Sequence, residues 1–402
     1  MKRIYLDYAS TTPVDKRVLG EMLPYFSERF ENSSSIYLGG LVARAAIDSA
    51  REKIGKFLNC QPEEVIFTSG GTESDNLAIF GVARNKKKGH IITSSIEHPA
   101  VYEACKRLEA EGFEVTYLKP DKAGILSAEK VKKALKNNTI LVSIMYANNE
   151  IGTIQPIREI SKVIRDFRKQ KTESRSQKSG NWKLVSGIEK MALPFFHTDA
   201  CQATPYLEMD VLKLGVDLLT LNGSKVYGPK GIGVLYRRNG IEIESQVIGG
   251  EQEDGNRAGT ENVASIVGLA KAIELTVGKD GKKEKNYRDY LVKELSEIKV
   301  ISFNGSLRKR LPNNVNFSID GVEGESVLLD LDRQGIAIST GSACSSRSLS
   351  PSRVIAEIAN DKVAHESIRV TVGRFTTKRE IDIFLKALKK SIKRFKEMSP
   401  YV

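Results

Sequence analysis

The chain has few of the features that mark a membrane, secreted or metal-binding protein. No stretch of its 402 residues approaches the roughly 18 consecutive apolar residues that a membrane-spanning helix needs. Residues 1–7 contain no apolar signal region before their first acid, so we expect a cytoplasmic protein. The cysteines are few and lie far apart, which excludes a disulfide framework and a CxxC metal site: Cys60, Cys105, Cys201 and Cys344. We therefore predict a reduced protein that holds no metal.

The one unusual feature of the composition is a net charge of +12. An excess of this kind is typical of proteins that bind nucleic acid or an acidic partner. Here the lysines are spread through several helix-length segments, without interleaved aromatic residues and without a helix-turn-helix or zinc pattern. We therefore expect no direct contact with nucleic acid. A solvated surface is the first explanation of the charge, and an acidic protein partner is the second.

Apolar runs of strand length alternate with helix-length amphipathic segments between about residues 60 and 235. The runs are 65–68, 90–93, 114–118, 140–145, 195–197, 217–221 and 233–236. Strands that are apolar along their whole length are typical of a mostly parallel sheet with helices on both faces. The sequence therefore predicts an α/β fold built on such a sheet.

The pattern changes after about residue 262, where helical segments dominate and strand-like runs are confined to 315–318 and 368–371. This pattern favours a smaller α+β domain. We predict a large domain at residues 14–262 and a small domain made of residues 1–13 and 263–402. Thr377 and Glu380 form a capping-box pattern ahead of a final helix over 381–395. The polar segment at about 168–190 is interpreted as an exposed, mobile insertion in the large domain.

Polar residues follow the ends of five of the predicted strands. They are Gly71 with Thr72, His98, Asn149, Asp199 and Lys225. In an open parallel sheet the ligand site lies at the carboxyl ends of the strands. We therefore expect these side chains to meet in one site.

Lys225 and Asp199 suit one cofactor in particular, pyridoxal phosphate. This cofactor needs an amine for its aldehyde and a carboxylate that keeps its ring nitrogen protonated. For either residue alone, a surface lysine or a helix-capping aspartate is the better explanation. The two contexts together favour the cofactor.

Two further motifs are compatible with the same cofactor. Gly71 and Thr72 open a predicted helix, whose free N–H groups can bind a phosphate, although an ordinary glycine turn explains them equally well. His98 can stack on a pyridine ring or move protons, although a lone histidine is more often structural. Neither motif decides the function by itself.

Cys344 differs from the other cysteines because it lies in a run of small polar residues, 339–352. Such a run leaves a thiol exposed. A free thiol has a pKa of about 8.5, so a few per cent is thiolate at neutral pH, and the neighbouring Arg347 favours that form. We interpret Cys344 as a reactive thiol, against the alternative of an inert surface cysteine, and the other three cysteines as structural.

Motifs along almost the whole chain resemble those of the cysteine desulfurases of the nitrogenase and iron–sulfur-cluster type. This group belongs to the class V aminotransferases, which are fold-type I pyridoxal-phosphate enzymes. The matching stretches are 5–13, 68–76, 96–101, 147–153, 197–202, 227–233, 257–262, 341–344 and 367–374. The resemblance implies a fold-type I α/β enzyme, a sulfurtransferase that converts L-cysteine to L-alanine and retains the sulfur as a persulfide.

The resemblance also implies roles for single residues. Lys225 would bind the cofactor, pyridoxal 5′-phosphate, covalently through its aldehyde, and His98 would stack on its ring. The remaining cofactor contacts would come from Gly71, Thr72, Asp199, Gln202, Asn222 and Ser224, and from Thr260 of the partner subunit of a homodimer. Asn149 and Arg369 would hold the substrate carboxylate, Arg369 as a bidentate fork. The catalytic residues would be Lys225, His98 and Cys344, whose thiolate would attack the substrate sulfur.

The chain departs from the family at two positions beside the lysine. Asn222 and Ser224 stand where a serine and a histidine are usual. Both side chains still offer hydrogen bonds, so we expect cofactor binding with altered affinity or rate. Two alternatives stay open: another reaction on the same scaffold, such as transamination or a selenocysteine lyase, and a catalytically weakened scaffold protein.

The expected partners are L-cysteine, a second copy of the chain and a protein that accepts the sulfur. Iron–sulfur cluster assembly and tRNA thiolation both draw on such persulfides, so the acceptor would be an iron–sulfur scaffold or a tRNA thiolation enzyme. The net charge of +12 suits an acidic acceptor. No membrane contact is expected.

Overall fold

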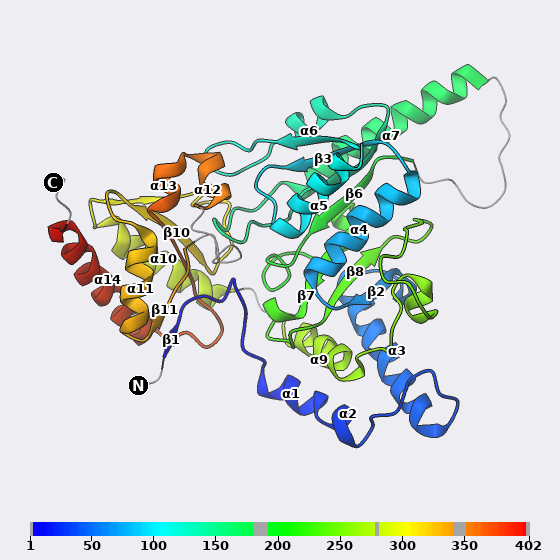
Figure 1. Cartoon of the computed structure of the whole chain (residues 1–402), viewed down its shortest axis with the longest axis horizontal. Coiled ribbons are helices and arrows are strands. Elements are labelled where there is room, and N and C mark those ends of the chain that lie inside the picture. The colour runs from blue at the N-terminus through cyan, green and yellow to red at the C-terminus, as the bar shows by residue number, and fades with distance from the viewer. Residues whose placement is uncertain (1–2, 180–191, 278–280, 341–350, 399–402) are drawn as a thin grey trace.

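A seven-stranded sheet forms the centre of the larger half of the molecule (Figure 1). The structure is a computed structural model that describes residues 3–179, 192–277, 281–340 and 351–398. The strand order is β2-β8-β7-β6-β5-β3-β4. The strands are β2 (Val65–Thr68), β3 (His90–Ser94), β4 (Glu114–Leu118), β5 (Thr139–Ser143), β6 (Phe195–Asp199), β7 (Leu218–Asn222) and β8 (Gly233–Arg237). Within the described residues β8 alone runs antiparallel to its neighbours, so the predicted mostly parallel sheet is confirmed.

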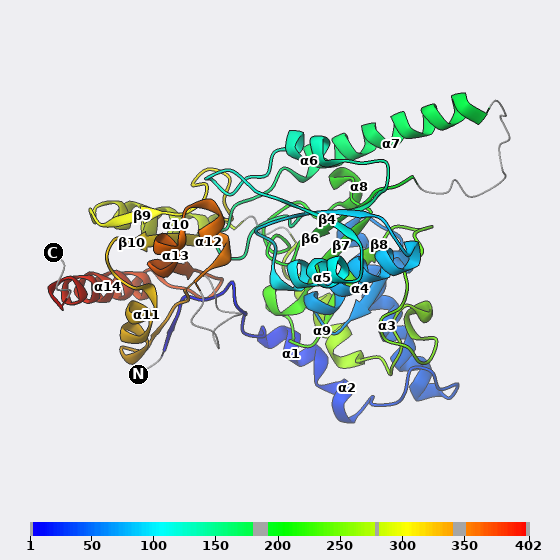
Figure 2. The same ribbon diagram turned by 45° about the horizontal axis from the view of Figure 1, so that its top comes forward.

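Helices cover both faces of this sheet, which explains why its strands are apolar throughout (Figure 2). One face packs on α4 (Gly71–Lys86) and α5 (Pro99–Ala110). The other face packs on α1 (Lys16–Met22), α3 (Leu38–Leu58), α6 (Ala128–Ala134), α7 (Ile157–Ser179), α8 (Val211–Leu214) and α9 (Val263–Glu274). Alternate residues of β2 serve the two cores: Ile66 contacts the first set of helices, and Val65 and Phe67 contact the second.

The smaller half has its own core and a three-stranded antiparallel sheet of order β12-β10-β9. Its strands are β9 (Ile301–Phe303), β10 (Asn314–Ile319) and β12 (Ser367–Thr371), and β1 (Ile4–Tyr5) pairs in parallel with β11 (Ile336–Ala337). Its helices are α10 (Lys282–Ser296), α11 (Gly324–Arg333), α12 (Arg353–Ile358), α13 (Asp361–His365) and α14 (Lys378–Met398). The predicted capping box precedes α14, because Glu380 Oε2 accepts the Thr377 N–H at 2.8 Å.

Short elements connect these layers. They are α2 (Pro24–Ser27) and the 3₁₀ turns η1 (Pro62–Glu64), η2 (Gly223–Lys225) and η3 (Gln252–Gly255). The predicted domain boundary at residue 262 stays a prediction. However, Ile266, Leu269 and Ile273 of α9 lie in the core of the larger half, which argues for a boundary after Glu274.

The interpretation of 168–190 as an insertion stays a prediction, but its first half is helical and Arg168 is not exposed. Helix α7 continues through Ser179, and Arg168 Nε donates to the Pro194 carbonyl at 2.8 Å while the same guanidinium pairs with the buried Asp217. Arg168 therefore holds the helix against the sheet. The sequence does not indicate this role, because the residues around Arg168 are polar. Residues 180–190 lie outside the described part of the chain.

No helix in the described ranges is both long and apolar enough to cross a membrane.

Candidate active site

The two halves of the molecule enclose a cavity of about 420 Å³ at the carboxyl ends of β6 and β7. Nine of the predicted site residues line it: Gly71, Thr72, His98, Asn149, Asp199, Gln202, Asn222, Lys225 and Arg369. The larger half contributes all of them except Arg369, which comes from β12. The prediction that these separate strand ends form one site is consistent with this arrangement.

Lys225 enters the cavity from the short turn η2, directly after β7. Its Nζ donates to the carbonyl oxygens of Ala9 at 2.9 Å and Ser10 at 2.5 Å. The turn is fixed from the same side, since the N–H and Oγ1 of Thr12 both donate to the Ser224 carbonyl, at 2.8 and 2.9 Å. The N-terminal segment therefore forms one wall of the site and holds the lysine amine.

Acidic side chains gather at the closed end of the cavity. Asp199 is the last residue of β6 and accepts the Cys201 N–H through Oδ1 at 2.9 Å. Asp75, on α4, is 1% exposed, and its Oδ1 has no hydrogen-bond partner among the described residues. Burial, with the charge of Asp199 next, raises the pKa of Asp75 well above its usual range. Burial therefore disfavours a negative charge on Asp75, and Asp199 is the acidic side chain that lines the cavity at the end of β6.

Two buried neighbours keep this region uncharged. Burial raises the pKa of Glu97 to about 8, although Ser94 Oγ and the Met145 N–H donate to its carboxyl group. Burial also lowers the pKa of His197 to about 4, so this imidazole is neutral between Ser143 and Thr220. A cation that entered here would therefore be stabilised chiefly by Asp199.

Another part of the cavity wall is the N-terminus of α4, where Gly71 and Thr72 lie. The first N–H groups of a helix attract anions, as the prediction required. Gly71 also keeps the cavity open, because a Cβ at this position would lie 2.8 Å from Cys201 Sγ. Cys201, which was interpreted as structural, is buried and is part of the cavity wall.

His98 begins α5 and lies beside the cavity. Its Nδ1 accepts the Ala100 N–H at 3.1 Å, which places the imidazole proton on Nε2. Burial lowers the pKa of His98. The side chain is therefore neutral at pH 7, as stacking on a ring and exchange of a proton both require.

Arg369 is 2% exposed and is held on three sides. Its Nη2 donates to Asp7 Oδ1 at 2.8 Å and to Ser10 Oγ at 2.7 Å, and its Nη1 donates to the Asn149 carbonyl at 2.9 Å. Its Nε is buried and has no partner among the described residues. The guanidinium is thus oriented next to Asn149, with one donor unsatisfied.

These residues fit pyridoxal phosphate. The cavity has an amine at Lys225, carboxyl groups at Asp199 and Asp75, and a helix N-terminus for a phosphate at Thr72. Gln202 Nε2 donates to the Ala9 carbonyl at 2.9 Å, which fixes its amide at the cavity wall. The missing Cβ at Gly71 lets the start of α4 pack closely on Cys201 and Asn222, which also line the cavity.

Three predicted residues do not line the cavity within the described structure. Ser224 lies in η2, and its N–H donates to Asn222 Oδ1 at 3.1 Å. Thr260 is exposed and lines a separate cavity of about 210 Å³ near Arg257. Cys344 lies outside the described residues.

Sequence reasoning missed several residues that line the cavity. Ala9 and Ser10 act through backbone carbonyl groups, which no side-chain pattern indicates. Asp75 lies inside the stretch 68–76 that carries the resemblance. Its position there could have identified it as a second acidic residue of the site, beside Asp199. Met145 and Ala147 complete the wall and appear in sequence only as ordinary apolar residues.

Comparisons with known proteins agree with this geometry. The family model "Aminotransferase class-V" matches residues 4–171 and 173–384. A protein named cysteine desulfurase IscS, from Dictyoglomus turgidum, is 47% identical across 100% of this chain and 98% of its own length. A solved NifS-like protein is 33% identical with a TM-score of 0.85, covering 98% of this chain and all of that one. A solved structure of SspA in complex with cysteine is 36% identical with a TM-score of 0.79, covering 93% of this chain and all of that one. The chain therefore belongs to the class V aminotransferase family, in its cysteine desulfurase group.

Proposed function

We propose that this chain is a pyridoxal-phosphate-dependent cysteine desulfurase, which converts L-cysteine to L-alanine and keeps the sulfur as a persulfide on Cys344. The observation that carries the proposal is the meeting of Lys225, Asp199 and Arg369 in one cavity of about 420 Å³. An amine, a carboxylate and a guanidinium at this site match the aldehyde and ring nitrogen of the cofactor and the carboxylate of an amino acid.

Lys225, Asp199, Gln202, His98 and the start of α4 would hold the cofactor. When bound, pyridoxal phosphate withdraws electrons from the bonds of an amino acid attached to it. Asp199 would supply a carboxylate for the ring nitrogen of the cofactor, since burial raises the pKa of its neighbours Asp75 and Glu97 and so disfavours a negative charge on them.

The substrate would lie between Arg369 and Lys225. Arg369 and Asn149 bind the carboxylate, and the buried Nε of Arg369 is a donor still without a partner. The Lys225 amine accepts the α-proton at Nζ, and neutral His98 exchanges a proton at Nε2. The thiolate of Cys344 attacks the sulfur of the substrate, an S–S bond forms as the C–S bond breaks, and alanine leaves after the carbon is protonated.

The described residues on either side of Cys344 support its role. Ser339 pairs with Arg369, since the Arg369 N–H donates to the Ser339 carbonyl at 2.7 Å. On the other side, Ser352 Oγ donates to Glu150, and Arg353 Nη2 donates to the Glu97 carbonyl at 2.5 Å. The segment that carries Cys344 is therefore attached at both ends to residues beside the cavity.

The proposal is tested by measuring sulfide and alanine from L-cysteine in the presence of a reductant. Wild type should release the two in equal amounts, and Cys344→Ala should release neither while it retains the visible absorbance of the bound cofactor. Cys60→Ala, which changes a half-buried cysteine far from the cavity, should behave as wild type. Alanine or pyruvate formed without Cys344 would favour transamination or another lyase reaction, and absence of the cofactor absorbance from a folded wild type would favour a scaffold protein.

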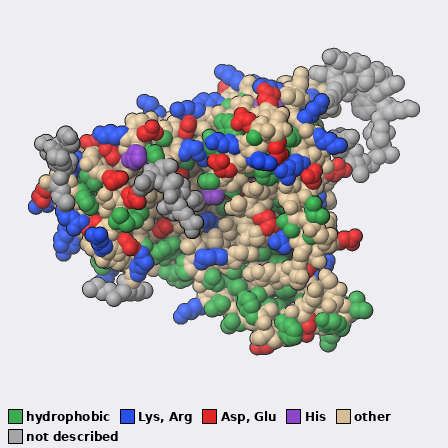
Figure 3. All heavy atoms as spheres, in the orientation of Figure 1, with side chains coloured by type: hydrophobic (Ala, Val, Ile, Leu, Met, Phe, Trp, Pro, Cys, Tyr) green, Lys and Arg blue, Asp and Glu red, His purple; other side chains and the backbone are tan. Residues whose placement is uncertain are grey.

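We also propose that the chain acts as a homodimer through an exposed apolar face at α1–α3. Figure 3 shows apolar side chains gathered over the lower part of the molecule, where these helices lie. The face consists of Leu19, Leu23, Phe26, Phe30, Ile36, Tyr37, Leu38 and Leu41, all at least 45% exposed. Exposed apolar patches of this extent mark interaction sites. Thr260 lies at its edge, because Ser33 Oγ donates at 2.8 Å to the neighbouring Glu261.

This arrangement supports Thr260 as the residue that reaches the phosphate of the partner's cofactor. Phe26→Glu with Ile36→Glu should convert the dimer to a monomer in sedimentation analysis and weaken cofactor binding. The matched change Leu329→Glu, at a 54% exposed residue of α11, should leave the protein dimeric. A wild-type monomer with full cofactor affinity would disprove the proposal.

The sulfur acceptor that we propose is an acidic protein, such as an iron–sulfur scaffold or a tRNA thiolation enzyme. Helix α14 supports this choice, since eight of its residues are lysine or arginine and only three are acidic. The affinity for such an acceptor should fall strongly as the salt concentration is raised from about 50 to about 200 mM, because salt screens the attraction between exposed charges. Binding that does not respond to salt would contradict an acidic acceptor.

A further inference from the structure

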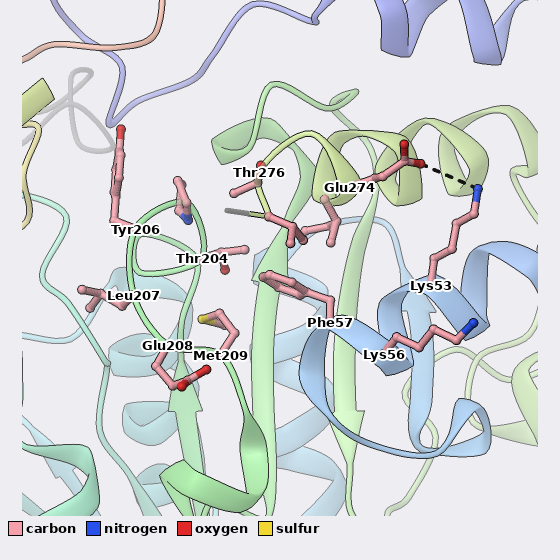
Figure 4. Close-up of a pocket in the computed structure, with 13 residues that line it drawn as sticks. Lys53, Lys56, Phe57, Thr204, Tyr206, Leu207, Glu208, Met209, Glu274 and Thr276 are labelled. Atoms are coloured by element: carbon pink, nitrogen blue, oxygen red, sulfur yellow. Dashed lines mark ion pairs between the residues drawn. The ribbon is translucent and has the colours of Figure 1, made fainter. Parts of the chain in front are cut away.

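A second cavity, larger than the one around Lys225, lies on the other side of the turn that follows β6. Its volume is about 570 Å³, and it shares no lining residue with the site described above. Its walls come from the last turns of α3, the end of α9 and the turn Thr204–Met209 (Figure 4). A cavity of this size is typical of sites for small organic ligands.

The interior of this cavity is apolar. It is lined by Phe57, Leu207, Met209, Ile273 and Val277, and Figure 4 shows the Phe57 ring pointing toward its middle. Thr204 and Thr276 also line it, but their hydroxyl groups donate at 2.8 and 2.9 Å to carbonyl groups of their own chain segments. These hydroxyls are already used, so the interior favours a hydrocarbon group.

The rim of the cavity carries Lys53, Lys56, Glu208 and Glu274. Their ion pairs determine whether the rim attracts an anionic or a cationic ligand. Glu208 accepts from Lys213 at 2.9 Å, although Lys213 also pairs with Asp210 at 3.4 Å, and Glu274 accepts from Lys271 at 2.9 Å, so each carboxylate has a lysine partner outside the cavity. The pKa of both glutamates is accordingly lowered by these hydrogen bonds. The two carboxylates therefore offer little attraction to a cation.

The two lysines of the rim are much less engaged. Lys53 and Lys56 both come from α3, and Figure 4 shows them on the same side of the cavity, across from Glu208. The Nζ of Lys53 forms an ion pair with Glu274 at 3.9 Å, dashed in Figure 4, which is too long for a hydrogen bond and is exposed to solvent. Both lysines are exposed at the rim, so their ammonium groups can turn toward a ligand.

We propose that this cavity binds an amphipathic monocarboxylate, with the hydrocarbon chain among Phe57, Leu207 and Met209 and the carboxylate at Lys53 and Lys56. Burial of the chain supplies most of the free energy, and the two lysines select an anion over a cation. The site is independent of the proposed desulfurase reaction. It lies directly behind the wall of the cofactor cavity, because Thr204 Oγ1 and N–H both bind the carbonyl of Ala200, two residues before Gln202.

Decanoate is the probe for this site, titrated into the cofactor-loaded dimer and followed by calorimetry. Wild type should bind one decanoate per chain with a dissociation constant below about 1 mM, and should bind decylammonium at least tenfold more weakly. The double change Lys53→Glu with Lys56→Glu should weaken decanoate at least tenfold and strengthen decylammonium. Leu207→Trp, which fills the interior, should abolish binding of both.

The matched control is Lys162→Glu with Lys169→Glu, two charge reversals at exposed positions of α7. This variant should bind decanoate as wild type does. The proposal is overturned if wild type shows no saturable binding, if decylammonium binds as well as decanoate, or if the α7 variant loses as much affinity as the α3 variant.

Discussion

Arg369 Nη2 lies 2.8 Å from Asp7 Oδ1, although 362 positions separate the two residues in the chain. The Arg369 side chain is 2% exposed and that of Asp7 is 16% exposed, so the ion pair is largely removed from water. Ser10 and the Asn149 carbonyl complete the contacts of the same guanidinium. The N-terminal segment therefore orients the residue that we propose as the anchor of the substrate carboxylate.

Replacing Asp7 with alanine should destabilise the fold and weaken substrate binding together. Removal of one partner from a buried ion pair leaves an uncompensated charge, and costs about 3 kcal/mol of unfolding free energy. The matched change is Asp332→Ala, which breaks the exposed pair with Arg3 and should cost less than about 1 kcal/mol. Urea denaturation and the KM for L-cysteine are the measurements. Equal costs for the two variants would contradict the assignment of Asp7 as the orienting residue.

Glu97 should make the protein less stable as the pH rises. Burial raises its pKa to about 8 in the folded state, above the value of 4.5 expected when it is unfolded. Between pH 4.5 and 8 the folded state binds more protons, so the free energy of unfolding falls with pH by up to about 1.4 kcal/mol per unit.

Glu97→Gln should remove this contribution, which urea denaturation at several pH values between 5 and 8 would detect. Glu111→Gln is the control, because hydrogen bonds from Arg107 and Arg84 lower the pKa of Glu111. The stabilisation that Glu111 provides is present above pH 4.5 and is lost only as the pH falls below it. Parallel pH profiles for wild type and Glu97→Gln would show that Glu97 is ionised throughout.

Two substitutions of His98 should separate its role in stacking on the cofactor from its role in proton transfer. His98→Phe keeps a flat ring and should retain the cofactor absorbance, but it should lower kcat about 100-fold because the Nε2 proton is lost. His98→Ala should lose both properties. Since burial lowers the pKa of His98, the wild-type rate should show no His98 titration between pH 7 and 8. Full activity of His98→Phe would remove His98 from the catalytic residues.

Gly71→Ala should weaken cofactor binding by steric overlap. The added Cβ would lie 2.8 Å from Cys201 Sγ and 3.4 Å from Asn222 Nδ2. Overpacking of this kind costs about 1–3 kcal/mol. If Cys201 and Asn222 shift into the cavity to relieve it, the dissociation constant of the cofactor should rise by about 5- to 150-fold. The second change Cys201→Ala removes the sulfur and should restore most of the affinity. Gly20→Ala, where no atom lies within 4 Å, serves as the control.

The sheet and most of the cavity were predictable because local patterns encode them. Strands such as Phe195–Asp199 are buried along their whole length, and this makes them visible as apolar runs. Asp199 and Lys225 follow such runs, so the parallel topology brings them together. The contacts of Ala9 and Ser10 with Lys225 were not predictable, because they use backbone oxygen atoms and join residues more than 200 positions apart.

Other features depend on tertiary packing that the local sequence does not express. Residues 168–179 look like a polar insertion, yet Arg168 ties them to Asp217 of the neighbouring turn and the helix continues. Helix α9 follows the predicted domain boundary, yet its apolar side packs on α1 and α3. The cavity behind Thr204 combines three segments that are each unremarkable in sequence.

The pairing of β1 with β11 has a consequence for the order in which the protein is made. Ile4 leaves the ribosome first but pairs with Ile336, and Asp7 pairs with Arg369, near the end of synthesis. The larger half can pack its core while translation continues, because domains fold as units during synthesis. Ala9 and Ser10 contact Lys225 of the larger half, whereas the contacts of Asp7 and Ser10 with Arg369 form only after residue 369 has been made. The Lys225 side of the cavity can therefore form before Arg369, which completes its other side, has been made.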